Sequence, residues 1–337
     1  MLGPESKPDS KPRAGEFELI ERYFAPLAAA AEGTFGLHND AAVLPVGPGE
    51  RLVATVDTMI KGRHFLDCPP DLVARKLLRV NLSDLAAMGA RPFGYLLASA
   101  WPLDIEEAWI ASFAEGLAQD QKRFGIALYG GDTTATPGPM TLSLTAFGTV
   151  TGTAVLDRGS VQAGDDLYVT GNIGDGYLGL LALRGELDGL PADAREALVA
   201  RYRLPEPRLA AGQALLAEGI ARSALDVSDG LAADLGHLLE ASGVGAELEL
   251  AAVPVGAAAE AALGLLGKPR KLLLSGGDDY ELAFAASPAR REAVAALSRR
   301  LGLPIARIGR AVAGQGLTLR GPDGEAVALE KPGWTHF

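Results

Sequence analysis

The stretch from Val73 to Pro92 constrains the fold most, because it reads as one apolar helix with polar residues inside its most hydrophobic part. Three leucines recur there at helical spacing, while Asn81 and Asp84, three residues apart, project together at the edge of the apolar stripe. Gly89 is the expected stop. A carboxylate in such a place is costly unless something pairs with it. For a lone Asp84, a hydrogen-bonded structural role is the simpler interpretation, so its meaning depends on what lies beside it.

The length of 337 residues suggests two domains, and the hydrophobic content of 48% is enough for ordinary cores. Residues 1–14 are rich in Pro, Lys and Ser and lack an apolar run, so we expect a disordered tail rather than a signal peptide. The best linker candidate begins at residue 158. We therefore expect an N-terminal domain over residues 15–157, with a mixed sheet and helices, and a C-terminal domain over residues 158–337.

Charge and composition argue against several classes of partner. The formal net charge of −11 disfavours nucleic acid, because binding to a phosphate backbone needs a clustered basic surface. The longest apolar runs are too short for a membrane span. The single cysteine, Cys68, excludes an internal disulfide and a multi-cysteine metal site, so a reducing cytoplasm is the expected compartment.

Aspartates recur where predicted elements begin, end or face a site. Six of them share this placement: Asp40, Asp57, Asp84, Asp132, Asp226 and Asp229. Each has a simpler explanation, since loop aspartates often cap turns, and Ser228 or Asp229 could cap the helix that follows. If even four converge, however, their repulsion in a partly buried site requires cations. Oxygen ligands without clustered Cys or His favour magnesium or manganese over zinc, and magnesium favours substrate phosphates as further ligands.

Phosphoryl transfer would need positive charge on the developing oxygens. The glycine-rich turn from Gly171 to Gly176 lacks the spacing of known phosphate loops, so we interpret it as structural. Several magnesium ions would then carry the task, with Arg158 assisting. His64, seven residues after Asp57, is either a histidine at the edge of the core or a functional one, and the functional interpretation is slightly favoured.

A series of motifs carries a family resemblance from about Gly15 to the C-terminus. In order they read GEFELI, NDAAVL, TVDTMIKGRHF, KLLRVNLSDLAAMGARP, YGGDTT, RGSVQAGDDLYVTG, DVSDGLAADLGHL and SGGDDYEL. Each is common alone, but together they resemble the thiamine-monophosphate kinase family. That family belongs to a superfamily with aminoimidazole ribonucleotide synthetase, selenophosphate synthetase and hydrogenase-maturation proteins.

The resemblance implies two α/β domains, a homodimer with paired N-terminal sheets, and ATP bound across a magnesium-rich groove. It implies direct transfer of the γ-phosphoryl group to thiamine monophosphate, giving thiamine diphosphate, with no residue as a covalent nucleophile. The implied metal ligands are Asp40, Thr55, the Val56 backbone, Asp57, Asp84, Asp132, Asp226 and Asp229. The implied ATP contacts are Gly131, Asp132, Arg158 and Ser228, and the implied substrate contacts are His64, Asp278 and Trp334.

Two positions depart from the family pattern: Asn39 precedes Asp40 where an acid is common, and Asp278 stands where Glu is frequent. Two other functions remain open. One is a superfamily relative that activates a different acceptor with ATP, although Cys68 lies in the wrong context for selenophosphate synthesis. The other is a nucleotide-binding or scaffold protein, which would bind magnesium and ATP without acceptor-dependent release of ADP.

Overall fold

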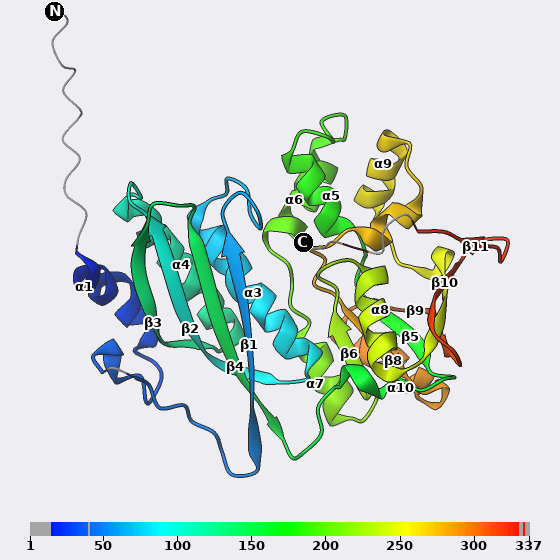
Figure 1. Ribbon diagram of the computed structural model, residues 1–337, viewed down its shortest axis with the longest axis horizontal. Helices are drawn as coiled ribbons and strands as arrows, with labels where there is room; N and C mark the ends of the chain where they lie inside the picture. The colour runs from blue at the N-terminus through cyan, green and yellow to red at the C-terminus, as the bar shows by residue number, and fades with distance from the viewer. Residues whose placement is uncertain (1–14, 40, 330–332, 334–337) are drawn as a thin grey trace, which may run out of the picture.

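Two mixed β-sheets, each carrying helices, make up the computed structural model of this chain, which describes residues 15–39, 41–329 and 333. Figure 1 shows the two sheets side by side with helix α3 between them. The α/β class agrees with the prediction. Asp40, Trp334 and the predicted tail over residues 1–14 lie outside the described residues. Within the described ranges, no helix is long and apolar enough to span a membrane.

The N-terminal sheet has four strands in the order β1-β4-β2-β3, in which only β2 and β3 run parallel. The strands are β1 (Glu50–Ile60), β2 (Arg91–Pro102), β3 (Ala127–Thr136) and β4 (Thr141–Thr151). Burial alternates along β4 from Thr141 to Ala146, as its sequence pattern predicts, and every residue from Ala146 to Val150 is buried. Helices α3 (Pro70–Ala87) and α4 (Glu107–Phe124) pack together and cover one face of this sheet.

The other face of the N-terminal sheet is only partly covered. The predicted first helix is divided into α1 (Glu16–Leu19), a π-helical turn (Ile20–Phe24) and α2 (Ala25–Ala28), and the break adjoins Pro26 as expected. This segment and the loop after it lie over one end of the sheet. On β1, the side chains of Leu52 and Val56 remain 43% and 59% exposed.

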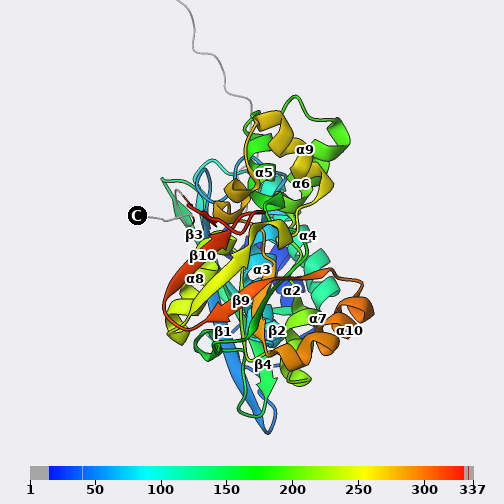
Figure 2. The ribbon, with the colours of Figure 1, turned by 90° about the vertical axis from the view of Figure 1, so that its right-hand side faces the viewer.

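The C-terminal sheet has seven strands in the order β11-β10-β7-β9-β5-β8-β6. Its strands are β5 (Asp166–Thr170), β6 (Ser223–Asp226), β7 (Gly245–Glu249), β8 (Leu282–Ala286), β9 (Ile305–Val312), β10 (Gly316–Arg320) and β11 (Ala326–Val327). Its helices are α5 (Asp175–Leu183), α6 (Ala192–Arg203), α7 (Leu209–Ala217), α8 (Leu231–Ser242), α9 (Ala257–Leu266) and α10 (Arg291–Leu301). Helix α8 packs on one face, and α7 and α10 pack on the other (Figure 2).

Helix α3 packs against both halves of the chain and lies at their junction. Its last residues, Ala86 and Ala87, belong to the same buried cluster as Phe284 of β8. The approach to α7 is so close that a β-carbon on Gly212 would lie 1.9 Å from the carbonyl oxygen of Ala86. The helix ends where the sequence predicts, with Gly89 in the left-handed conformation at φ 70°. Residues on the face of α3 toward the C-terminal half therefore lie at the junction of the two sheets.

Candidate active site

Four of the predicted aspartates gather at this junction, and we call them the acidic cluster: Asp57, Asp84, Asp226 and Asp229. Asp57 comes from β1, Asp84 from α3, Asp226 from the last position of β6, and Asp229 from the turn that follows. Their charges act on one another: Asp84 and Asp229 raise the pKa of Asp57, and Asp84 and Asp57 raise that of Asp226. Four of the six aspartates that the sequence singles out therefore lie close enough to repel one another.

Burial is the main cause of the altered acidity in this cluster. Together with repulsion from Asp84 and Asp229, burial raises the pKa of Asp57 to about 7. It also raises the pKa of Asp226 well above its usual range. For Asp84 the rise caused by burial is opposed by the hydroxyl of Thr55, which donates a hydrogen bond of 2.5 Å to Oδ2, and by the charge of Arg158. Thr55 and Arg158 thus lie beside the cluster.

The acidic cluster fits hard divalent cations. Its donors are oxygens, and among the described residues the surroundings of Asp57 act only against its ionised form. A bound cation would offset this repulsion between carboxylates. Among the described residues, no three His, Cys, Asp or Glu side chains already stand in the arrangement of a metal site. Val56 could contribute only its backbone carbonyl, because its side chain is apolar and 59% exposed. The donor set therefore suits magnesium held jointly with waters and ligand phosphates.

The strand positions of two aspartates differ from the prediction. Asp57 and Asp132 were expected at strand ends, but both lie inside their strands, because β1 and β3 continue to Ile60 and Thr136. Pairing of β1 with β4 extends over the whole length of β1 and aligns Asp57 with Leu144. The ladder of backbone hydrogen bonds therefore carries both strands past the polar residues that suggested their ends.

Asn81 has the structural role that a buried polar residue most often has. It is fully buried, its Oδ1 accepts a hydrogen bond of 3.1 Å from the backbone N–H of Asp57, and its Nδ2 donates to the carbonyl of Leu77 at 2.9 Å. The side chain thereby ties β1 to α3 next to the acidic cluster. Of Asn81 and Asp84, only Asp84 joins the acidic cluster itself.

The turn between β6 and α8 is held by a residue that the sequence analysis missed. Oδ2 of Asp234 accepts hydrogen bonds of 3.0, 3.1 and 3.1 Å from the backbone N–H groups of Ser228, Asp229 and Gly230. The simpler explanation for Ser228 and Asp229, that one of them caps this helix, does not hold, since α8 begins at Leu231 without a side-chain cap from either. A carboxylate in the first helical turn after Gly230 was the available signal. Asp234 fixes the backbone of the turn that carries Asp229.

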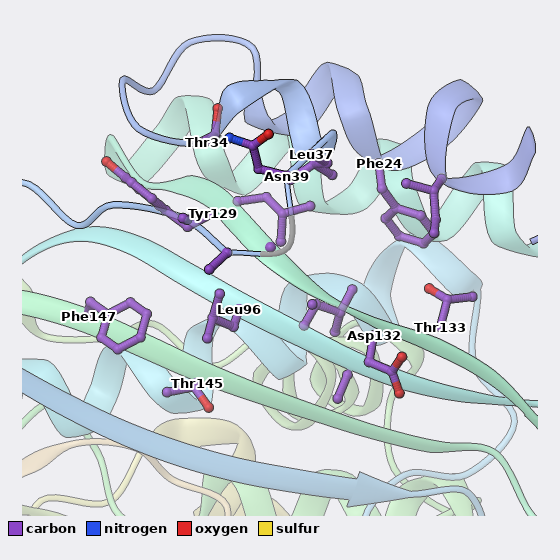
Figure 3. A pocket seen from close by; sticks show the side chains of 18 of the residues that line it. Phe24, Thr34, Leu37, Asn39, Leu96, Tyr129, Asp132, Thr133, Thr145 and Phe147 are labelled. Carbon is purple, nitrogen blue, oxygen red and sulfur yellow. The ribbon is translucent and has the colours of Figure 1, made fainter. Parts of the chain in front are cut away.

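Asp132 lies apart from the acidic cluster within one chain. Strand pairing places Asp57, Leu144, Leu97 and Gly131 in one row across the sheet, so three strand spacings of about 4.8 Å, or about 14 Å, separate the two edges. Asp132, next in β3, faces the opposite side of the sheet from Asp57. There it lines a cavity of about 560 Å³ between the sheet and the N-terminal segment. Figure 3 shows Asn39 and Leu96 in the wall of the same cavity.

Gly131, the residue before Asp132, sits where β2 and β3 approach closely. A β-carbon at this position would lie 1.8 Å from the carbonyl oxygen of Leu97. This packing alone accounts for a glycine here, whether or not a nucleotide also contacts it. The second glycine pair, Gly276 and Gly277, precedes Asp278, whose backbone N–H donates to the carbonyl of Ser228 at 2.9 Å. That bond lays the loop of residues 276–281 along the turn that carries Asp229.

The predicted substrate residues His64 and Asp278 come from loops on the two sides of the junction. Nδ1 of His64 accepts a hydrogen bond of 3.0 Å from the backbone N–H of Ile60, so the proton of the neutral ring is on Nε2. Asp278 has a left-handed backbone with φ 67°, which is uncommon for a residue with a side chain. The carboxylate of Asp279 anchors the loop by accepting from the N–H groups of Gly174 and Gly176 at 2.8 and 3.0 Å. The glycine-rich turn before α5 is thus structural, as predicted.

Comparison with known proteins identifies both halves of the chain. Residues 38–150 match the family described as AIR synthase related protein, N-terminal domain, and residues 162–321 match its C-terminal domain. Among curated proteins, the thiamine-monophosphate kinase of Caulobacter vibrioides is 43% identical over 95% of this chain and 90% of its own. The thiamine-monophosphate kinase of Escherichia coli K12 is 40% identical over 96% and 98%.

Solved structures agree with these matches. Thiamine-monophosphate kinase from Stenotrophomonas maltophilia K279a is 40% identical, with a TM-score of 0.81 over 93% of this chain and 98% of its own. AaThiL complexed with AMPPCP and TMP is 28% identical, with a TM-score of 0.76 over 96% and 97%. The hydrogenase maturation protein HypE of E. coli, at 22% identity and a TM-score of 0.77, shares the fold. The chain belongs to the thiamine-monophosphate kinase family.

Proposed function

We propose that this protein transfers the γ-phosphoryl group of ATP to thiamine monophosphate and forms thiamine diphosphate. The family membership supports this activity, and so does the related AaThiL structure, which holds AMPPCP, an ATP analogue, together with TMP. The observation from this chain that carries the proposal is the acidic cluster at the junction of the two halves. Four carboxylates from separate elements would repel one another there without the cations that accompany ATP.

The acidic cluster and Thr55 would hold magnesium, which supplies positive charge to the phosphoryl oxygens during transfer. The acceptor oxygen belongs to a phosphate that is already anionic, so attack on the γ-phosphorus needs no strong general base. Positioning and neutralisation of charge then account for most of the rate. Arg158, which lies close enough to Asp84 to lower its pKa, adds a permanent cation on the same side.

The remaining predicted contacts stay part of this proposal. Ser228 and Arg158 would contact ATP beside the acidic cluster, and His64 and Asp278 would contact thiamine monophosphate farther along the junction. Two further residues lie outside the described ranges: in this proposal Asp40 would be a metal ligand, and Trp334 would contact the substrate. We also retain the domain boundary between residues 157 and 158 and the cytoplasm as the compartment, which the single cysteine suits.

We further propose a homodimer in which the N-terminal sheets pair and Asp132 of the partner subunit completes each site. The support is geometric: Asp132 lies about 14 Å from the acidic cluster and on the other face of its own sheet, the face that also carries the exposed apolar side chains of Leu52 and Val56 on β1. Mixed dimers of Asp57→Asn and Asp132→Asn test this arrangement. Shared sites would restore activity on mixing two inactive variants, because one site in each mixed dimer has neither substitution. No restoration, or a monomeric mass in solution, would contradict it.

The activity itself is tested by incubating the purified protein with magnesium, ATP and thiamine monophosphate and quantifying both products. We expect thiamine diphosphate and ADP in equal amounts, and neither of them after magnesium is removed. A panel of other phosphorylated acceptors serves as the control for specificity. Release of ADP with another acceptor only would favour the activity of a superfamily relative, and ATP binding without release of ADP would favour a binding protein.

A further inference from the structure

Lys76 is a buried charge that none of the predicted roles uses. It lies on α3 with a side chain only 5% exposed, and its Nζ donates to Oδ1 of Asp278 at 2.7 Å. The same ammonium stands 3.6 Å from the ring centroid of Tyr202, at the end of α6. Burying a lysine requires partners of this kind, because an unpaired ammonium in a protein interior is strongly disfavoured. Lys76 has two, a carboxylate and an aromatic face.

The position of Lys76 on α3 points toward the proposed site. Val80 and Asp84 follow it at intervals of four residues, so the three side chains lie along one face of the helix. The eight residues from Lys76 to Asp84 span about 12 Å of helix. Lys76 therefore lies about the length of a small phosphorylated molecule away from the acidic cluster. The face of α3 thus carries the proposed metal and phosphate end at Asp84 and a second charged group two turns away.

The partners of Lys76 are the segments that carry the proposed substrate contacts. Asp278 is one of those contacts, and the hydroxyl of Tyr202 donates a hydrogen bond of 3.4 Å to the backbone carbonyl of His64, the other. The backbone around Asp278 is fixed in an uncommon left-handed conformation by its N–H bond to Ser228. The carboxylate, 28% exposed, would still be free to change rotamer without the ammonium.

We propose that Lys76 is a positioning residue for the acceptor: it holds the carboxylate of Asp278 in place and, through Tyr202, connects it with the loop of His64. This inference rests on the proposed function and extends it to a residue that contacts no reacting atom. Lys76 should therefore matter for the acceptor and not for ATP, because its contacts with Asp278 and Tyr202 lie at the acceptor end of the junction. A purely structural ion pair would instead affect stability and both substrates alike.

The test compares wild type, Lys76→Met, Asp278→Asn and the double variant, with Lys122→Met, an exposed lysine of α4, as the matched control. Methionine keeps the length and loses the charge, and Lys76→Gln serves in its place should Lys76→Met fail to fold. We expect KM for thiamine monophosphate to rise about 10-fold in Lys76→Met, in proportion to a lost charged hydrogen bond, with KM for ATP and Tm nearly unchanged. The double variant should be no worse than Asp278→Asn, since Lys76 acts through Asp278. Lys122→Met should match wild type.

Binding of thiamine monophosphate, measured by titration calorimetry with AMPPCP and magnesium present, separates this inference from the proposed activity. A wild type that binds the acceptor without forming thiamine diphosphate would contradict the activity, while the affinities of the variants would still decide the role of Lys76. Wild-type affinity in Lys76→Met, or effects of Lys76→Met and Asp278→Asn that multiply in the double variant, would overturn the inference. A wild type with no affinity for thiamine monophosphate would overturn both.

Discussion

Replacing Asp57 by asparagine should stabilise the metal-free protein while it removes activity. Burial, with a smaller contribution from the charges of Asp84 and Asp229, raises the pKa of Asp57 from 3.8 to about 7. A carboxyl whose folded pKa is raised costs nothing below its unfolded pKa and its full penalty above the folded one. At 1.36 kcal/mol for each pKa unit, the penalty above pH 7 is at most about 4 kcal/mol. Since the side chain is partly exposed, solvent should reduce this to about 1–3 kcal/mol.

The assay is thermal unfolding of wild type and Asp57→Asn at pH 5 and pH 8, in EDTA and in magnesium. At pH 8 in EDTA we expect the Tm of the variant to exceed that of wild type by about 2–6 °C, taking about 2 °C for each kcal/mol. The difference should shrink at pH 5, where Asp57 of the wild type is mostly protonated, and magnesium should raise the Tm of wild type more than that of the variant. Asp104→Asn, an exposed control before α4, should behave as wild type.

A Tm for Asp57→Asn at or below that of wild type, at pH 8 without metal, would refute this reasoning. It would mean that the protein itself stabilises the ionised carboxylate of Asp57, as it does for most buried aspartates. The acidic cluster would then be stable without a bound cation. An increase in Tm of equal size at both pH values would contradict the assignment of the effect to ionisation of Asp57.

Three further predictions concern residues that support the site. The guanidinium of Arg79 is 3% exposed and pairs with Asp120 at 2.6 Å, so Asp120→Ala leaves it without its buried partner. Urea titration should show that the free energy of unfolding falls by about 3–5 kcal/mol, and an unchanged midpoint would count against this pair. Gly212→Ala puts a β-carbon 1.9 Å from the carbonyl oxygen of Ala86, so the free energy of unfolding should fall by about 1–3 kcal/mol, and an unaltered value would show that α3 and α7 can separate there. Asp234→Ala releases three backbone N–H groups beside Asp229, and magnesium titration of the activity should show affinity weaker by about 10-fold or more; wild-type magnesium affinity would remove Asp234 from the support of the turn.

The part of the fold that the sequence predicts best is the part set by local patterns. Helix α3 could be predicted with its end at Gly89 because leucine spacing and a left-handed glycine are local signals. The alternation in β4 was equally readable. The ends of β1 and β3 were misjudged, because pairing with neighbouring strands extends both past Asp57 and Asp132. Such pairing depends on partners far away in the sequence.

The candidate site shows the same division. Residue types and element boundaries singled out six aspartates, and the structure brings four of them together in the acidic cluster. That Asp132 faces away from them depends on strand order and on which face each residue occupies, neither of which local patterns reveal. Lys76 and Asp234 escaped the sequence analysis because a lysine in an amphipathic helix and an acid in a first helical turn are ordinary features. The role of Lys76 follows from its contact with Asp278, 202 residues away in the sequence. The role of Asp234 follows from hydrogen bonds to the backbone of the preceding turn, up to 6 residues away.

The most direct test of this account is transfer of label from [γ-³²P]ATP to thiamine monophosphate by wild type, Asp57→Asn and Asp104→Asn at saturating magnesium. We predict labelled thiamine diphosphate at equal rates from wild type and Asp104→Asn, and a rate lower by about 100-fold or more from Asp57→Asn, as for loss of a group that stabilises charge in the transition state. Labelled product from Asp57→Asn at the wild-type rate, or no labelled product from wild type, would contradict it.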